Sequence, residues 1–114
     1  WFAWVPTLTG GQTDLPSYTT ARFAVNGRIC SIVFLVDNVT LTGSTGVIQV
    51  TLPVSSIITN SFWGTYAWFK TVYLISRSVI VAGAYFELWK GITSEQWVGN
   101  ETGIYIRITG SYEI

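Results

Sequence analysis

The sequence contains no histidine, no methionine and a single cysteine, and only 11% of its 114 residues are charged. Without histidine the chain has no imidazole base and no histidine ligand for a metal, which excludes Ser-His and Cys-His nucleophilic catalysis. One cysteine, Cys30, excludes an intrachain disulfide and any metal site built from several cysteines. Six basic and six acidic residues give zero net charge without a basic run, which argues against nucleic-acid binding.

Long uninterrupted apolar runs are also missing. The uncharged residues 38–69 include a proline and many Ser, Thr and Gly residues, which is typical of strands and turns. The apolar run at 71–89 is interrupted by Ser76-Arg77-Ser78. Neither stretch resembles a membrane-spanning helix, so we expect no membrane insertion. The lack of methionine suggests a piece of a longer polypeptide.

What the sequence has instead is alternation of apolar and polar residues. In residues 46–53, Ile48, Val50 and Leu52 occupy every second position, and residues 103–110 repeat the pattern with three isoleucines. Such alternation predicts half-buried strands. Asn26-Gly27, between the predicted strands 21–25 and 28–36, predicts a hairpin.

These signals predict the fold class. Residues 42–44, Thr-Gly-Ser, predict a further turn, and no segment has helical spacing of apolar residues. We expect an all-β chain, an antiparallel β-sandwich of jelly-roll type with about eight strands. At 114 residues it forms a single domain, 1–114.

Two segments are apolar on both faces, residues 28–36 and the stretch 66–89 with a break near Arg77. A strand that is apolar on both sides is buried on both sides. The cover for the second face is either a loop of the same chain or a neighbouring subunit.

Two segments break the alternation and are predicted to be loops at the ends of the sandwich. Residues 55–67 carry Trp63 and Tyr66, and residues 90–103 are polar and glycine-rich around Trp97. Loops on a rigid β-scaffold are where binding residues usually lie.

Four segments, in this order, resemble the C-terminal receptor-binding domain of tailed-bacteriophage tail fibres. They are WFAWVPTLTG at 1–10, RFAVNGRICSIVFLV at 22–36, GSTGVIQVTLPVSS at 43–56 and GIYIRITGSYEI at 103–114. The resemblance covers about two-thirds of the chain and leaves most of the middle, 57–102, unmatched.

The resemblance implies a trimeric β-sandwich head, the C-terminal fragment of a longer fibre protein. Such a head lies at the distal end of the virion's tail fibre or baseplate and binds a saccharide of the host cell surface. A homotrimer would also cover the strands that are apolar on both faces. The partners expected are therefore two further copies of the chain and a host glycan.

Aromatic and polar loop residues are the candidate saccharide ligands. An indole or phenol face stacks on a sugar ring, and nearby carboxylates and amides bond to its hydroxyls. The candidates are Trp97, Trp63, Tyr66, Glu95, Asn100 and Glu101. Trp1 and Trp4 are instead expected to pack against the sandwich or the next subunit, and Cys30 to be a buried, unreactive thiol.

We expect neither an enzyme nor a cofactor. Glu95 and Glu101 share a loop and form the best carboxylate pair for glycoside cleavage, but the chain does not resemble the long β-helical spikes that cleave polysaccharide. No Asp-rich loop with calcium-binding spacing is present. Two alternative functions remain, a structural trimerisation or tip-capping module without a ligand and a monomeric carbohydrate-binding module.

Overall fold

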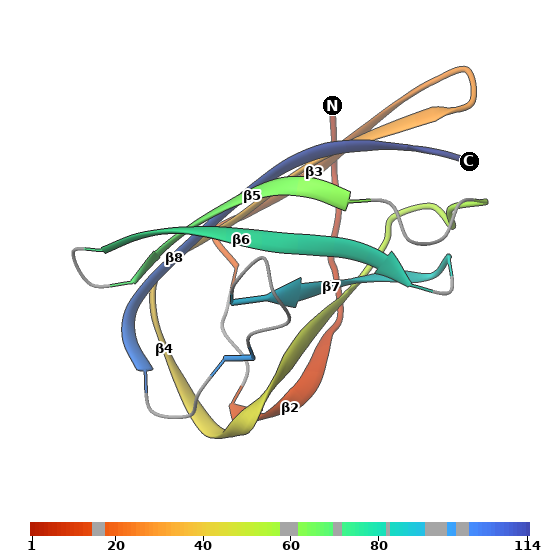
Figure 1. Ribbon diagram of the computed structural model, residues 1–114. Coiled ribbons are helices and arrows are strands. Elements are labelled where there is room, and N and C mark those ends of the chain that lie inside the picture. The colour runs from red at the N-terminus through yellow and green to blue at the C-terminus, as the bar shows by residue number, and fades with distance from the viewer. Residues whose placement is uncertain (15–17, 58–61, 70–71, 82, 91–95, 98–100) are drawn as a thin grey trace.

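The computed structural model describes residues 1–14, 18–57, 62–69, 72–81, 83–90, 96–97 and 101–114 (Figure 1). All regular secondary structure within these residues is β-strand, and every strand pairing is antiparallel. The strands are β1 (Phe2–Ala3), β2 (Leu8–Asp14), β3 (Thr20–Asn26), β4 (Ile29–Thr51), β5 (Phe62–Phe69), β6 (Val72–Val81), β7 (Tyr85–Trp89) and β8 (Glu101–Glu113). The predicted all-β, antiparallel class is confirmed.

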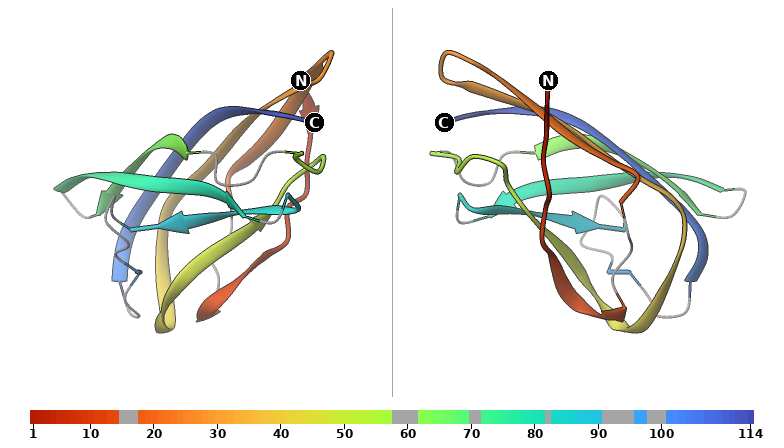
Figure 2. Two further views of the ribbon diagram at one scale, coloured as in Figure 1. Left: turned by 45° about the vertical axis from the view of Figure 1, so that its right-hand side comes forward. Right: turned by 180° about the vertical axis from the view of Figure 1, so that it is seen from behind.

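Strand β4 organises the fold because it belongs to two antiparallel sheets. Its first part pairs with β3 and β8, and its last part pairs with β2 and β7. Between these parts β4 bends sharply at the lower end of the molecule, as both Figure 1 and Figure 2 show. Strands β7, β6, β5 and β8 then pair in turn, so the hydrogen-bonded network returns to β4.

Two sequence-predicted breaks are wrong. Residues 42–44 do not leave the strand, because Thr42 and Gly43 of β4 pair with Asp14 and Gln12 of β2. The pairing shifts register on both sides of the bend, which is how an antiparallel strand turns a corner while keeping partners. Likewise Arg77 does not interrupt its strand, since it lies inside β6.

The predicted hairpin is confirmed, with its turn one residue later than Asn26-Gly27. Strands β3 and β4 pair up to Asn26 opposite Ile29, which leaves Gly27 and Arg28 as the turn. Gly27 has φ of 59°, in the left-handed region where a side chain adds strain. The hairpin tip, both chain ends and the segment after β4 lie toward the same end of the molecule (Figures 1 and 2).

The core lies between the sheets and follows the predicted alternation. The three isoleucines of β8, Ile104, Ile106 and Ile108, are fully buried, as are Ile48 and Val50 of β4. An aromatic cluster of Trp4, Phe34 and Phe86 lies among these side chains, with ring centroids 6.1–6.4 Å apart. Because Phe34 belongs to the first part of β4 and Phe86 to β7, the cluster joins the two sheets.

Candidate functional site

Trp97 is part of the core and not of a surface loop. Its side chain has no exposed area, and its indole Nε1 donates a hydrogen bond to the carbonyl oxygen of Leu88 at 3.2 Å. Its backbone forms a two-hydrogen-bond bridge with Gly46, both bonds being 2.9 Å long. A saccharide needs an exposed ring face, so the predicted ligand role of Trp97 is wrong for this arrangement.

Trp63 and Tyr66 lie in a strand, which corrects the expected loop at 55–67. Both belong to β5, where Trp63 pairs with Ser78 of β6, and Tyr66 pairs with both Ile75 of β6 and Arg107 of β8. The backbone of Tyr66 therefore lies between two other strands, and that of Trp63 is paired with β6, so neither is at a loop tip. The structure does not describe their side chains.

The remaining predicted ligands are only partly covered. Glu95 and Asn100 lie outside the described residues. Glu101 begins β8, where its backbone pairs with Leu41 of β4. The structure therefore does not bring the six candidates together as one described site.

A different surface combines an exposed indole with hydroxyl groups. It is a groove of ≈ 450 Å³ on the outer face of β4 and β8, beside Trp1. We call it the Trp1 groove, and the residues that line it are Trp1, Ser31, Ile32, Val33, Thr109, Gly110 and Ser111. The outer position of this surface follows from alternation, since Cys30, Ile32 and Phe34 between these β4 residues are buried in the core.

Strand register explains how the Trp1 groove is assembled. Ser31 pairs directly with Ser111, and Val33 with Thr109, so two successive outer-face positions of β4 lie beside two of β8. The Oγ atoms of Ser31 and Ser111 are 2.7 Å apart and form a hydrogen bond. Trp1 immediately precedes β1, which runs antiparallel to β3 at the edge of the same sheet. Sequence reasoning missed this site because the groove forms only when residues 1, 31–33 and 109–111 meet.

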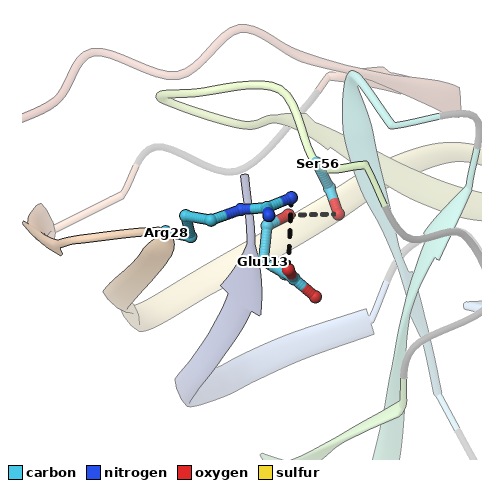
Figure 3. Close-up of polar contacts among 3 residues, drawn as sticks. All are labelled: Arg28, Ser56 and Glu113. Atoms are coloured by element: carbon cyan, nitrogen blue, oxygen red, sulfur yellow. Dashed lines mark hydrogen bonds and ion pairs between the residues drawn. The ribbon is translucent and has the colours of Figure 1, made fainter.

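The end of the molecule near the hairpin tip is held together by backbone and polar contacts. The guanidinium Nη2 of Arg28 lies 3.4 Å from Oε1 of Glu113, and the Oγ of Ser56 donates to the carbonyl oxygen of Glu113 at 3.3 Å (Figure 3). The ion pair is largely exposed and contributes little stability. These contacts place the C-terminal end of β8 between the hairpin turn and the segment that follows β4.

Exposed aliphatic side chains surround these contacts. Val25 and Ile29 flank the hairpin turn and are 45% and 44% exposed, and Ile57 is 60% exposed. The backbone N–H of Ile57 donates to the carbonyl oxygen of Glu113, which brings Ile57 to the same end. We call these three residues the apolar end.

Cys30 is buried, as predicted, and faces Tyr112 across β4 and β8. Burial raises the pKa of the Cys30 thiol, and a hydrogen bond with Tyr112 partly opposes this shift. Burial also raises the pKa of Tyr112, whose hydroxyl donates to the carbonyl oxygen of Val54 at 2.7 Å. A thiol held protonated in this way is a packing element, because the thiolate is the nucleophilic form.

In comparisons with known proteins, no family model, curated protein or solved structure matched this chain. The part of the chain that the structure describes contains no helix suited to crossing a membrane. Among the same residues, no three His, Cys, Asp or Glu side chains gather closely enough to hold a metal ion. The structure offers the Trp1 groove and the apolar end as its candidate functional surfaces.

Proposed function

We propose that the chain is the receptor-binding head of a tailed-phage fibre or baseplate protein, a jelly-roll-like homotrimer that binds a saccharide of the host cell surface. The observation that carries this proposal is where the four fibre-like segments lie in the fold. They supply β1, the first three residues of β2, most of β3, much of β4 and nearly all of β8. These strands pair directly with one another, in β1–β3, β3–β4, β2–β4 and β4–β8.

The segments that carry the resemblance are therefore one connected structural unit rather than scattered matches. The unmatched middle of the sequence forms β5, β6 and β7, which complete the second sheet and its link to β8. A scaffold from one set of segments and a middle that carries no family motif fit proteins that keep a head fold and change their receptor.

The homotrimer is supported by composition and by the apolar end. The chain has zero net charge and few charged residues to oppose self-association. Val25, Ile29 and Ile57 expose aliphatic surface at one end of the described chain. Burial of such side chains between subunits is favourable by about 25 cal/mol per Å² of apolar area.

A trimer serves this function because three weak sites on one head bind a cell surface more tightly than one site. A shallow saccharide site has a dissociation constant near the millimolar range, about −4 kcal/mol. Three such sites on one rigid head raise the effective affinity for a glycan-coated cell by about two to four orders of magnitude. The proposed localisation is accordingly the outer end of a virion tail structure.

The test joins solution mass with cell binding. Light scattering coupled to size exclusion gives the mass, which we expect to be three times the 12.6 kDa of one chain and stable on dilution. A fluorescent conjugate is then incubated with a panel of bacterial cells and with purified cell-wall polysaccharide. A trimer that binds some of these supports the proposal, and free polysaccharide should compete with the cells.

Other outcomes favour the two alternatives. A trimer that binds no cell or polysaccharide is a trimerisation or tip-capping module, which the apolar end also fits. A monomer that binds polysaccharide is a single-chain carbohydrate-binding module. A monomer without saccharide binding overturns both parts of the proposal.

A further inference from the structure

The floor of the Trp1 groove offers hydroxyl groups at defined positions. Ser31 and Ser111 are held together by their 2.7 Å hydrogen bond, and Thr109 is the next outer-face residue of β8. Each hydroxyl can both donate and accept, which suits the hydroxyls of a sugar.

The floor also has an apolar part. Val33 lies beside Thr109 and is half-buried. A pyranose ring has an apolar face of C–H groups and an equatorial rim of hydroxyls, so a binding surface needs both kinds of contact. The groove provides the two kinds within one pair of adjacent strands.

The wall of the groove is an indole that the fold leaves exposed. Trp1 is 65% exposed, whereas Trp4 is 7% exposed and Trp97 has no exposed area. The neighbouring Phe2, which is 66% exposed, lines no part of the groove, because its ring packs against Phe23 at a centroid distance of 5.7 Å. Two adjacent aromatic residues with equal exposure thus belong to different surfaces.

We propose that the Trp1 groove binds one pyranose unit of a cell-surface glycan. The indole of Trp1 stacks on the C–H face of the ring, and the Ser31–Ser111 pair and Thr109 bond to its hydroxyls. The groove is shallow and open, which suits an internal unit of a polymer better than an enclosed small molecule. The inference rests on the proposed saccharide-binding function and assigns it to residues outside the six predicted from the sequence.

The experiment is a titration of the isotope-labelled chain followed by ¹H–¹⁵N NMR. The probes are the methyl glycosides of glucose, galactose, rhamnose and N-acetylglucosamine, followed by purified polysaccharide from any strain that the chain binds. We expect shifts of the Trp1 indole N–H and of the amides of Ser31, Thr109 and Ser111. Trp1→Ala should weaken binding about tenfold or more, as truncation of an aromatic anchor commonly does.

Phe2→Ala is the matched control, because it removes an equally exposed aromatic side chain one residue away, and it should change affinity less than about twofold. The double variant Ser31→Ala/Ser111→Ala keeps the indole and should also weaken binding. The dispersion of each variant's spectrum shows that it is folded.

The outcomes separate this inference from the function on which it rests. If a glycoside or polysaccharide binds but shifts residues elsewhere, and Trp1→Ala binds as well as the parent chain, the groove is not the site and the proposed function stands. If no probe and no cell binds, the proposed function and the groove both fall. Equal losses in Trp1→Ala and Phe2→Ala would also overturn the groove, since only Trp1 lines it.

Discussion

Replacing Trp97 by alanine tests whether this residue belongs to the core, as the structure has it, or to a saccharide site. The buried indole is enclosed without exposed area and is bonded to the Leu88 carbonyl. We expect Trp97→Ala to lower the free energy of unfolding strongly. A surface ligand residue would give the opposite result, with lost binding and unchanged stability.

The magnitude follows from the buried area. A tryptophan buries roughly 150–250 Å², which at about 25 cal/mol per Å² corresponds to about 4–6 kcal/mol. Residual burial in the unfolded chain reduces this by roughly 10–40%, to about 3–5 kcal/mol. Measured truncations of core aromatic residues give the same range, about 3–5 kcal/mol.

Two further variants divide this loss into its parts. Trp97→Phe keeps most of the apolar area but removes the N–H that serves the Leu88 carbonyl, so we expect a smaller loss of about 1–3 kcal/mol. Trp1→Ala makes the same substitution at a side chain that is 65% exposed, and should change stability by less than about 0.5 kcal/mol.

The assay is equilibrium unfolding in urea, followed by far-ultraviolet circular dichroism so that the loss of a tryptophan does not alter the signal. Agreement of two probes establishes that the transition is two-state before free energies are compared. If the chain is a trimer, the variants are compared at equal protein concentration. A Trp97→Ala chain within about 1 kcal/mol of the parent would refute the core position, because truncation of a buried aromatic side chain typically costs about 3–5 kcal/mol.

Three other predictions follow from the fold. Gly83→Ala should destabilise the chain by at least about 1 kcal/mol more than Gly27→Ala in the same urea assay. Both glycines have positive φ, but a Cβ would meet open space at Gly27, whereas at Gly83 it would lie 2.6 Å from the backbone oxygen of Ser56. The free energy of unfolding should be constant below about pH 9 and should fall as the pH rises further. The reason is that folding raises the pKa of Cys30 above its ordinary 9.0 and that of Tyr112 above its ordinary 10.0, so the folded chain holds protons that the unfolded chain releases. Tyr112→Phe should flatten this decline, and stability that increases above pH 9 would contradict the assignment. In native buffer the Cys30 thiol should react with an aromatic disulfide reagent at least about a hundredfold more slowly than in urea-unfolded chain, and equal rates would show that the thiol is accessible.

The strands were predictable where apolar residues alternate and every second side chain reaches the same core. In β8 the positions of Ile104, Ile106 and Ile108 determine which face is buried, and all three are. The hairpin at Gly27 was also predictable, because adjacent residues determine the turn and no distant partner is needed. Short-range patterns carry this information without knowledge of the partner strand.

The errors occurred where a distant partner decides the structure. Residues 42–44 have the composition of a turn, yet β4 continues because β2 supplies partners for Thr42 and Gly43. Trp97 lies among polar residues, and its burial depends on a bridge to Gly46 that no local pattern announces. The Trp1 groove likewise needs residues from both ends of the chain and from β4, so its members share no motif.

The segment 28–36 shows how one sequence pattern can serve two surfaces. Its apolar character on both faces led us to expect a covering loop or a subunit on the second face. In the structure the inner face, with Cys30, Ile32 and Phe34, is closed by the core, while Val33 on the outer face is half-buried beside Trp1. Part of the second apolar face is therefore explained by the proposed ligand groove, without a covering loop. Ile29, at the apolar end, and the half-buried Leu35 lie outside the groove. The groove and the proposed trimer contact at Ile29 therefore use different residues of the same strand. Saccharide binding and trimerisation should then be separable, with Trp1→Ala weakening the first and Ile29→Ser weakening the second.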